Sequence, residues 1–413
     1  MASSRAFVSS PVNSPAARIR VLSVIDGLGF AGDESRLLSL GQNLNASRFH
    51  HSVLTLNPLA YATPDEFRAR RQHYLDAGLQ VDDLAEASPE RASRMAALPP
   101  ALYAKTGILR RARRLARLIR KWRVQVIDGH LESAGLVSVL AGRLTGTPSS
   151  ITLYCGARVG SDMIWPRSTR MALRMASAVL TDSRIRADQM RAFVPRNPQK
   201  VSVIPNGIPQ PLSQRSPAEM RRLLGLPQDP AVRIIGMVGR LVEYKGHEVL
   251  IQAAREVLAR APDTAFLAVG YTRTESYKQS LIRLTQELGI RDRFVIAEYP
   301  GSIGDIWSAI DIHVHASLFD SLPISIAEGM SFGKPAVVTS AGGIPEIVQH
   351  GITGLVVPPG DPAALAAALL DVLHNPELAR RLGAKARERY EQFYRPEIMA
   401  REMENFFTGM LRR

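Results

Sequence analysis

Residues 313–346 read HVHASLFDSLPISIAEGMSFGKPAVVTSAGGIPE, and the pattern of this stretch decides the fold. It starts at the end of an apolar strand, 312–315. A polar loop then leads to a helix that opens at Pro323, because the fixed φ of proline suits a first helical position. A second apolar strand, 336–339, is followed by a glycine pair, 342–343, and a further short helix. Strands that alternate with helices in this way predict an α/β fold.

Two carboxylates stand eight positions apart in this stretch. Asp320 lies in the polar loop and Glu328 inside the helix, where most neighbouring residues are apolar. A carboxylate buried without a partner is costly, so we expect a polar group to meet Glu328.

The glycine pair, Gly342 and Gly343, is suited to binding an anion. Glycines between a strand and a helix start let backbone N–H groups converge on a phosphate, and the helix N-terminus adds partial positive charge. Carboxylates that accept bonds from sugar or ribose hydroxyls would flank this loop, which together describes a nucleotide-sugar site. A capped turn without a ligand stays open as the alternative.

A second candidate loop follows the strand that begins at Arg233. It reads GRLVEYKG, residues 239–246, and a helix follows from His247. Arg240 offers a fork of donors and Lys245 a point charge, which suits a diphosphate. The alternative is a basic loop without a ligand, and either way we expect Lys245 to be exposed.

The first half of the chain opens with another βα unit. An apolar strand, 19–25, leads into a glycine-containing loop, 26–33, which also suits dinucleotide binding. His130 follows a strand at 124–127, and ligands of open α/β sheets lie beyond the carboxyl ends of strands. His130 is therefore a cleft candidate, with a purely structural histidine as the alternative.

The sequence here resembles a known family. The run from residue 320, DSLPISIAEGMSFGKPAVVTSAGGIPEIVQHGITGLVVPPGD, is similar to the C-terminal signature of GT-B glycosyltransferases of family 4: an acid, seven residues and a Glu, then G-x-P and a GG-x-x-E turn. The resemblance extends from about residue 19 to residue 394. At position 320 the family usually has Glu, one methylene longer than Asp. The resemblance implies two Rossmann-like α/β domains facing each other across a deep cleft, retention of anomeric configuration, and no metal.

The resemblance also assigns roles in donor binding. It implies that Glu328 holds ribose hydroxyls and Asp320 the transferred sugar, while Arg240 and Lys245 neutralise the donor pyrophosphate. The donor-binding candidates are Arg240, Lys245, Gly342, Gly343, Glu328 and Asn206, the last from the Asn-Gly-Ile turn. The catalytic candidates are Asp320, Glu328, Arg240, Lys245 and His130.

On the acceptor side the match is less complete. The glycine loop resembles the family's acceptor loop, which makes Gly32 and Asp33 candidates for acceptor contact. Where the family commonly has His-Gly, this chain has Cys155-Gly156. Cys155, Tyr154 and His130 are the alternatives for the missing histidine.

The implied organisation has four parts. Residues 1–17 are rich in Ser, Ala and Pro and fit a disordered tail, with a transit peptide as the alternative. Residues 18–207 form the acceptor domain and 208–390 the nucleotide-sugar donor domain. Residues 391–413 are a helix that crosses back to the first domain.

Charge is unevenly distributed. The net charge is +14, and residues 1–205 contain 29 basic and 15 acidic side chains, against 23 of each in 206–413. Nine of the basic residues lie in 105–123, where apolar residues recur at helical spacing. This helix either docks on an anionic membrane surface or packs on the core with a solvated basic face. Nucleic acid is disfavoured, because aromatic interleaving and a recognised binding motif are both absent.

The composition also bears on membrane spans, disulfides, metal sites and cellular location. No run of eighteen apolar residues predicts a transmembrane helix. The single cysteine, Cys155, permits no internal disulfide and fits a reducing compartment, and no Cys/His cluster has metal-ligand spacing. We expect a cytoplasmic protein, peripheral on the inner membrane face if the basic helix docks there.

The predicted function is transfer of a sugar from a UDP- or GDP-linked donor, with no further cofactor, to a glycan or lipid-linked acceptor in polysaccharide or glycoconjugate synthesis. One alternative is a catalytically inactive homologue that binds a nucleotide or a membrane, which the missing His-Gly and the change at Asp320 keep open. The other is a nucleotide-sugar epimerase, which shares the fold but lacks this spacing of acids and glycines.

Overall fold

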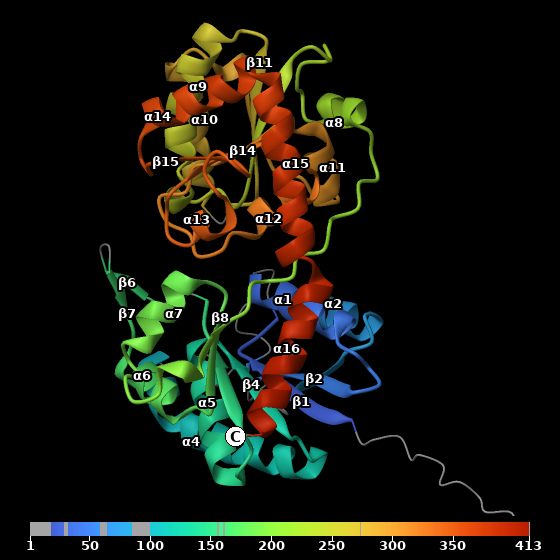
Figure 1. Cartoon of the computed structure of the whole chain (residues 1–413), viewed down its shortest axis with the longest axis vertical. Helices are drawn as coiled ribbons and strands as arrows, with labels where there is room; N and C mark the ends of the chain where they lie inside the picture. The colour runs from blue at the N-terminus through green and yellow to red at the C-terminus, as the bar shows by residue number, and fades with distance from the viewer. Residues whose placement is uncertain are drawn as a thin grey trace, which may run out of the picture.

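The computed structural model describes residues 18–28, 32–57, 64–84, 100–154, 157–159, 162–272 and 274–412. It has two α/β halves arranged end to end, with the second half above the first in Figure 1. The predicted tail, 1–17, and Cys155 lie outside the described residues.

The first half is built on a parallel sheet. Its described residues form seven strands in the order β3-β2-β1-β4-β5-β8-β9. The strands are β1 (Ile19–Ile25), β2 (Phe49–Thr55), β3 (Gln80–Asp83), β4 (Val126–His130), β5 (Ser149–Thr152), β8 (Ala178–Thr181) and β9 (Val201–Val203). The helices are α1 (Gly32–Asn43), α2 (Pro64–Asp76), α4 (Pro100–Trp122), α5 (Leu131–Thr145), α6 (Arg167–Met175) and α7 (Arg184–Arg191), and β6 (Ala157–Val159) pairs with β7 (Asp162–Ile164) as a hairpin.

The second half repeats this architecture. Its described residues form six parallel strands in the order β12-β11-β10-β13-β14-β15. The strands are β10 (Arg233–Val238), β11 (Thr264–Val269), β12 (Phe294–Ala297), β13 (Ile312–His315), β14 (Ala336–Thr339) and β15 (Leu355–Val357). The helices are α8 (Pro217–Leu223), α9 (His247–Arg260), α10 (Glu275–Glu287), α11 (Ile303–Ala309), α12 (Ile324–Ser331), α13 (Ile344–Ile347), α14 (Pro362–His374) and α15 (Pro376–Phe393). One more helix, α16 (Pro396–Leu411), follows them in the chain.

The predicted α/β fold is therefore confirmed, with small corrections at element ends. Pro323 precedes α12 instead of opening it, because its ψ of 125° is extended and leaves the proline in the N-cap position. His130 is the last residue of β4, whereas the sequence placed it after a strand at 124–127. β4 starts later than predicted, since Val124 donates to Ile119 O at the end of α4.

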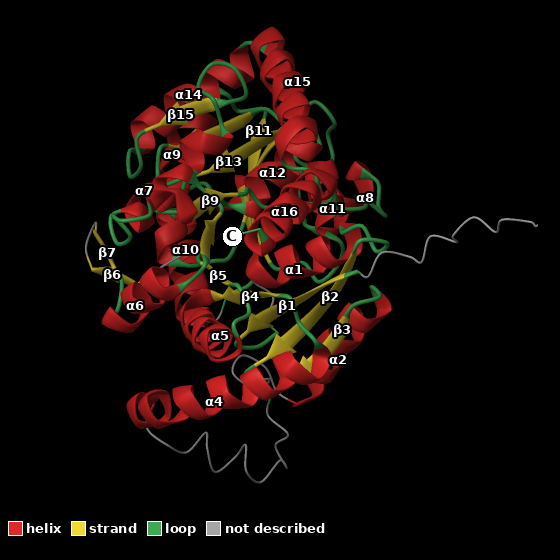
Figure 2. Ribbon diagram, turned by 60° about the horizontal axis from the view of Figure 1, so that its bottom comes forward, coloured by secondary structure: helices red, strands yellow, loops and turns green. Residues whose placement is uncertain are grey.

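Both faces of the second sheet are covered by helices. Ile235 packs in an apolar cluster with Leu250 of α9, whereas its neighbour Ile234 packs with Trp307 of α11. Successive side chains of a strand point to opposite faces, so β10 is apolar in both directions. Figure 2 shows the helices around the two sheets, with α4 along the outer edge of the first half.

The last helix, α16, lies against the first half (Figure 1). Met399, Met403 and Phe407 of this helix are buried in one cluster with Phe49 and Val126 of the first sheet. The connection between the halves passes close by, because a Cβ at Gly207 would lie 2.7 Å from the Cα of Pro396. The chain thus crosses between the halves twice, and the two crossings lie side by side.

This packing predicts the effect of truncating Phe407. Its side chain is fully buried, so Phe407→Ala should lower the free energy of unfolding by about 3–5 kcal/mol through lost burial and a residual cavity. Phe393→Ala is the matched control, because Phe393 is 48% exposed and its loss should change stability by less than about 1 kcal/mol. Urea unfolding of both variants measures the difference, and equal effects would contradict the packing described for α16.

Candidate active site

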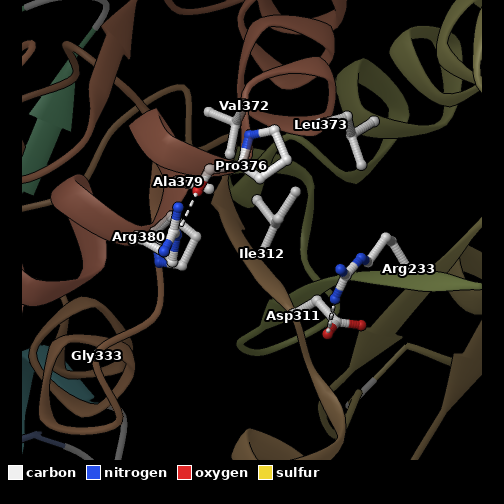
Figure 3. Close-up of a pocket in the computed structure, with 10 residues that line it drawn as sticks. Arg233, Asp311, Ile312, Gly333, Val372, Leu373, Pro376, Ala379 and Arg380 are labelled. Atoms are coloured by element: carbon white, nitrogen blue, oxygen red, sulfur yellow. Dashed lines mark hydrogen bonds and ion pairs between the residues drawn. The ribbon is translucent and has the colours of Figure 1, made fainter. Parts of the chain in front are cut away.

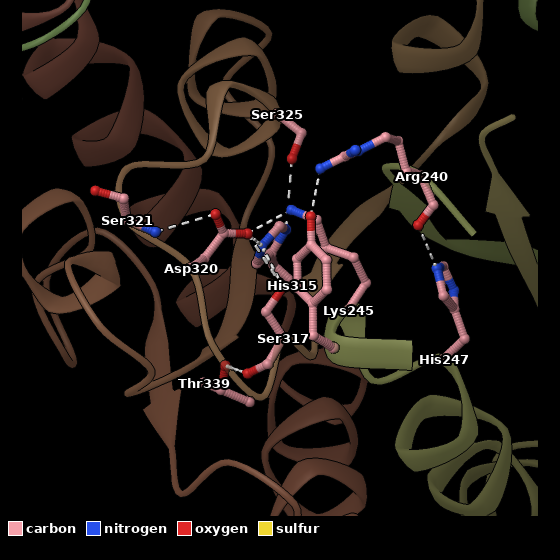
Figure 4. A network of polar contacts seen from close by, with 10 residues as sticks. Arg240, Lys245, His247, His315, Ser317, Asp320, Ser321, Ser325 and Thr339 are labelled. Carbon is pink, nitrogen blue, oxygen red and sulfur yellow. Dashed lines mark hydrogen bonds and ion pairs between the residues drawn. The ribbon is translucent and has the colours of Figure 1, made fainter. Parts of the chain in front are cut away.

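The predicted donor-site residues meet at one edge of the second sheet. Arg240 follows β10, Lys245 lies in the turn before α9, and Asp320 follows β13. The carboxyl ends of parallel strands lie at the same sheet edge, and β10 and β13 are direct neighbours. Figure 4 shows Arg240, Lys245 and Asp320 gathered around His315.

Lys245 forms an ion pair with Asp320, and both side chains are largely buried. Lys245 Nζ donates to Asp320 Oδ2, and the side chains are 11% and 16% exposed. The prediction that Lys245 is exposed was therefore wrong. The reason lies in the turn itself: Gly246 has a φ of 73°, and a Cβ there would be 2.1 Å from Ala316 O. The turn is thus pressed onto the loop after β13, which covers the lysine.

Asp320 has further partners that the sequence did not reveal. His315 Nε2 lies 3.1 Å from Asp320 Oδ2, and Ser317 Oγ donates to the same oxygen over 3.3 Å. Burial disfavours the ionised carboxylate, but the hydrogen bond from His315 and the charge of Lys245 outweigh it and hold the pKa of Asp320 well below its usual range. Asp320 is an anion at neutral pH. The only sequence signal for His315 was its place at the end of a predicted strand.

The side chain of Arg240, unlike that of Lys245, is exposed to solvent. Its guanidinium donates to the Tyr244 hydroxyl. The Arg240 carbonyl accepts from His247 Nε2 over 3.0 Å. Burial lowers the pKa of His247 to about 4, so this histidine is neutral at pH 7 and acts as a fixed donor. The backbone of Arg240 is therefore held while its charge faces solvent.

Glu328 has the polar partner that its helical environment required. Trp307 Nε1 donates to Glu328 Oε2 over 3.1 Å, and the Trp307 side chain is fully buried. Burial raises the pKa of Glu328 to about 7, although the bond from Trp307 opposes this shift. The carboxyl group consequently titrates near neutral pH.

The glycine pair performs a packing role in this structure. Gly342 has a φ of 57°, and a Cβ there would lie 1.8 Å from Asp320 O. A Cβ at Gly343 would lie 2.0 Å from Ser321 O, and the Gly343 amide donates to Asp320 O over 3.1 Å. The expectation that both amides converge on an anion needs correction for Gly343, because its N–H already has a partner. The following helix, α13, has only four residues.

The two halves touch beside this turn. The Glu346 carboxylate accepts from the backbone amides of Arg184 and Ile185, at 2.7 and 2.8 Å, and so caps α7 of the opposite half. Ser321 Oγ donates to Asp182 Oδ1 over 3.2 Å. Burial raises the pKa of Asp182 to about 6, with Arg36 and the Ser321 bond opposing. These partners are more than 130 residues apart along the chain, and sequence reasoning missed them.

Asn206 is tied to the first half. Its Oδ1 accepts from Arg36 Nη1 over 2.6 Å, and Arg36, which is 1% exposed, also donates to Ile204 O over 3.0 Å. Arg36 Nη2 reaches Met403 Sδ of α16 at 3.3 Å. Asn206 therefore helps to hold the two crossings between the halves together; its predicted contact with the donor stays a prediction.

His130 belongs to a buried polar group in the first sheet. Its Nε2 lies 2.9 Å from Asp128 Oδ2, and its Nδ1 lies 3.4 Å from the Tyr154 hydroxyl. Asp128 Oδ1 accepts from Ser150 and Thr152 at 2.7 and 2.6 Å. The structure thus brings together His130 and Tyr154, two of the three alternatives for the missing histidine.

Gly32 and Asp33 are the other acceptor-side candidates. They open α1, which places their backbone at the carboxyl end of β1, and nothing is described of their side chains. Within the described residues no group of three or more His, Cys, Asp or Glu side chains could hold a metal ion.

A pocket of about 300 Å³ lies at the opposite edge of the second sheet (Figure 3). Arg233, at the start of β10, and Asp311, just before β13, both line it. The Arg233 guanidinium donates to Asp311 over 3.3 Å. This pocket is at the amino ends of the strands and does not include the predicted site residues.

Each half of the chain matches a known family of domains. Residues 31–207 match the family model of the glycosyl transferase 4-like domain, and residues 223–389 match that of the glycosyl transferases group 1. The 2-deoxystreptamine glucosyltransferase of Streptomyces kanamyceticus is 28% identical over 281 residues, which are 63% of this chain and 71% of that protein. The D-inositol 3-phosphate glycosyltransferase of Corynebacterium diphtheriae is 32% identical over 206 residues, 48% of this chain and 48% of that protein.

Solved structures share the fold. Anabaena HepE in complex with UDP and glucose has a TM-score of 0.75 at 18% identity, covering 95% of this chain and 100% of that chain. With matched domain models in both halves and the acids, cations and glycines at the expected sheet edge, the chain belongs to the group 1 glycosyltransferases of GT-B fold, which transfer a sugar from a nucleotide-sugar.

Proposed function

We propose that this protein transfers a hexose, with retention, from a UDP- or GDP-linked donor to a glycan or lipid-linked acceptor bound by the first half. The observation that carries the proposal is the gathering of Arg240, Lys245 and Asp320 at the carboxyl ends of β10 and β13, with Glu328 on the helix that follows. The resemblance to family 4 supports retention.

The chemistry follows from charge. Negative charge develops on the diphosphate as it leaves the sugar, and preorganised cations stabilise that charge. Arg240 supplies an exposed guanidinium and Lys245 an ammonium in the next turn. Because Arg240 and Lys245 both lie beside the Tyr244 ring, with Arg240 Cζ 5.9 Å and Lys245 Nζ 5.7 Å from its centroid, we propose that these two cations stabilise the diphosphate and that transfer needs no metal ion.

The acids would recognise the rest of the donor. Asp320 is ionised at neutral pH and would accept bonds from hydroxyls of the transferred sugar. Glu328 would accept from ribose hydroxyls through Oε1 while Trp307 holds Oε2. On the acceptor side, Tyr154 and His130 would take the place of the family histidine, since their side chains meet.

A donor screen tests the proposal. UDP- and GDP-sugars are compared for thermal stabilisation of the purified protein, since a ligand bound only by the native state raises the unfolding midpoint. The stabilising donor is then incubated with the enzyme, and release of the nucleoside diphosphate is measured. Stabilisation without turnover would favour the inactive homologue.

Arg240→Ala should lower kcat/KM by at least about tenfold, because a cation that stabilises the leaving diphosphate is lost. The unfolding midpoint should stay close to that of the wild type, since the side chain is exposed. Arg260→Ala, which removes an exposed arginine at the far end of α9, is the control and should leave kinetics unchanged. Unchanged kinetics in Arg240→Ala would contradict the phosphate assignment.

The raised pKa of Glu328 predicts how donor binding depends on pH. Ribose hydroxyls that donate to the carboxylate favour its ionised form, which is dominant at pH 8 and minor at pH 6 when the pKa is about 7. The ratio of wild-type to Glu328→Gln affinity should therefore fall roughly tenfold from pH 8 to pH 6. Calorimetric titration with the nucleoside diphosphate selected by the screen measures this ratio, in which titration of the ligand cancels. A constant ratio would argue against the ribose role.

The basic helix α4 supports a membrane-facing acceptor. Its buried stripe packs on the core, as Leu115 and Ile119 show, while Arg113 and Arg117 are exposed on the outer side. Leu109 on that side is 57% exposed. The packing and membrane interpretations of this helix are thus compatible.

Neighbouring helices extend this outer face. Arg120 donates to Leu144 O over 2.7 Å, which joins α4 to the end of α5, and Leu144 is 48% exposed. Arg143 in turn donates to Met175 O of α6, where Met171 is 46% exposed. Exposed apolar side chains among arginines are suited to an anionic lipid surface. Among the described residues no helix is long and apolar enough to cross a membrane.

Charge reversal tests membrane docking. Wild-type protein should sediment with anionic vesicles at low salt and be released at high salt, since each arginine contributes about 1 kcal/mol within a Debye length of roughly 8 Å. Replacing the exposed Arg110, Arg113 and Arg117 by Glu should abolish sedimentation. The same reversal at three exposed arginines of the second half, Arg222, Arg255 and Arg283, is the control and should not.

Wild-type protein that stays in solution at every salt concentration would remove the membrane proposal. A soluble acceptor would then be favoured, such as the 2-deoxystreptamine or inositol phosphate named for the relatives.

A further inference from the structure

The ammonium that would bind the donor diphosphate already has an anionic partner. Lys245 donates to Asp320 Oδ2, and the two side chains are 11% and 16% exposed. Arg240, the other cation of the site, is exposed, and the partner described for its guanidinium is the neutral side chain of Tyr244, through both the hydroxyl and the ring. An incoming diphosphate therefore meets one accessible cation and one cation that a carboxylate occupies.

Asp320 is held by contacts other than Lys245. His315 Nε2 and Ser317 Oγ both lie beside its Oδ2, at 3.1 and 3.3 Å, and the Ser321 amide donates to Oδ1 over 3.1 Å. Gly342 packs against the Asp320 carbonyl, which fixes the backbone as well. If Lys245 turns toward a phosphate, the carboxylate stays where it is and loses its cationic partner.

We propose that Asp320 competes with the donor diphosphate for Lys245 and thereby makes the site prefer a sugar-bearing donor over the bare nucleoside diphosphate. The inference rests on the proposed function. A bare diphosphate that draws Lys245 away leaves a largely buried carboxylate beside a second anion, which is unfavourable where the effective dielectric constant is low. A donor sugar offers hydroxyls that donate to Asp320 and replace the lost partner.

The competition has a consequence for turnover. The product that remains after transfer is the bare diphosphate, with no sugar left to satisfy Asp320. Lys245 then returns to the carboxylate, and this return favours release of the product. Asp320 thus discriminates between donor and product through the lysine that both ligands need.

The test compares bare and sugar-bearing ligands in Asp320→Asn, which removes the charge but keeps the size of the side chain. Calorimetric titrations use UDP, UDP-glucose and inorganic pyrophosphate, with GDP and GDP-mannose in place of the uridine ligands if the donor screen selects guanine. Asp320→Asn should bind UDP and pyrophosphate at least about threefold more tightly than the wild type, because Lys245 is released and an anion is removed. The preference for UDP-glucose over UDP should fall by about the same factor or more.

Glu243→Gln is the matched control. Glu243 is exposed and lies two residues before Lys245, so its replacement makes the same change in net charge without touching the ion pair. Its affinities should stay within about twofold of the wild type, since exposed charges are screened. A gain in Glu243→Gln equal to that in Asp320→Asn would overturn the proposal, because net charge would then explain both.

Other outcomes are equally decisive. If Asp320→Asn binds UDP with lower or unchanged affinity, Asp320 does not compete for Lys245 but supports it, and the proposal is overturned. If the affinities for UDP and UDP-glucose rise equally in Asp320→Asn, the proposed preference for the sugar-bearing donor is overturned. Wild-type protein that binds neither uridine nor guanosine ligands contradicts the proposed function and this inference together, whereas wild-type binding without a rise in the affinity of Asp320→Asn overturns this inference alone.

The ion pair can also be tested without a ligand. Denaturant unfolding of Lys245→Met, Asp320→Asn and the double variant forms a double-mutant cycle. Each single variant leaves a buried charge unpaired, so the double variant should lose less stability than the sum of the two. Additive effects would overturn the pairing on which the competition depends. Asp320→Ser replaces Asp320→Asn in all measurements if the asparagine variant does not fold.

Discussion

The ion pair between Lys245 and Asp320 joins the two loops on which the second half of the site is built. Lys245 comes from the turn after β10 and Asp320 from the loop after β13, 75 residues further along the chain. Gly246 presses one loop against Ala316, and Gly342 presses the next turn against Asp320 itself. The glycines permit this close backbone approach, and the approach brings together two opposite charges, each of which would be unfavourable if buried without the other.

The same loop connects the donor site to the opposite half. Asp320 faces Lys245 and His315, whereas its neighbour Ser321 donates to Asp182 across the interface. Glu346, three residues after the glycine pair, caps α7 of the first half. A movement of the loop 317–321 on donor binding would therefore change its contacts with the first half, where the acceptor is proposed to bind.

Behind the site, the polar side chains of Trp307 and His313 are buried. Trp307 donates to Glu328 and stands edge-on to His313, with ring centroids 4.8 Å apart. Burial lowers the pKa of His313 well below its usual value, so this ring is neutral. A Cβ at Gly329 would lie 2.9 Å from His313 Nδ1, so the glycine beside Glu328 lets α12 approach the strand. The position of Glu328 consequently depends on a buried aromatic residue that local sequence does not connect with it.

The sequence by itself determined the alternation of strands and helices, the strands 312–315 and 336–339, and the residues that carry charge at strand ends, because these depend on local periodicity and on the chemistry of single residues. Tertiary structure alone decided that Lys245 is buried, that the Gly343 amide is engaged and that Trp307 meets Glu328. It also decided that Asn206 is held by Arg36. Each of these depends on which loops the parallel sheet brings to one edge, and contacts between residues tens to hundreds of positions apart leave no periodic trace in the chain.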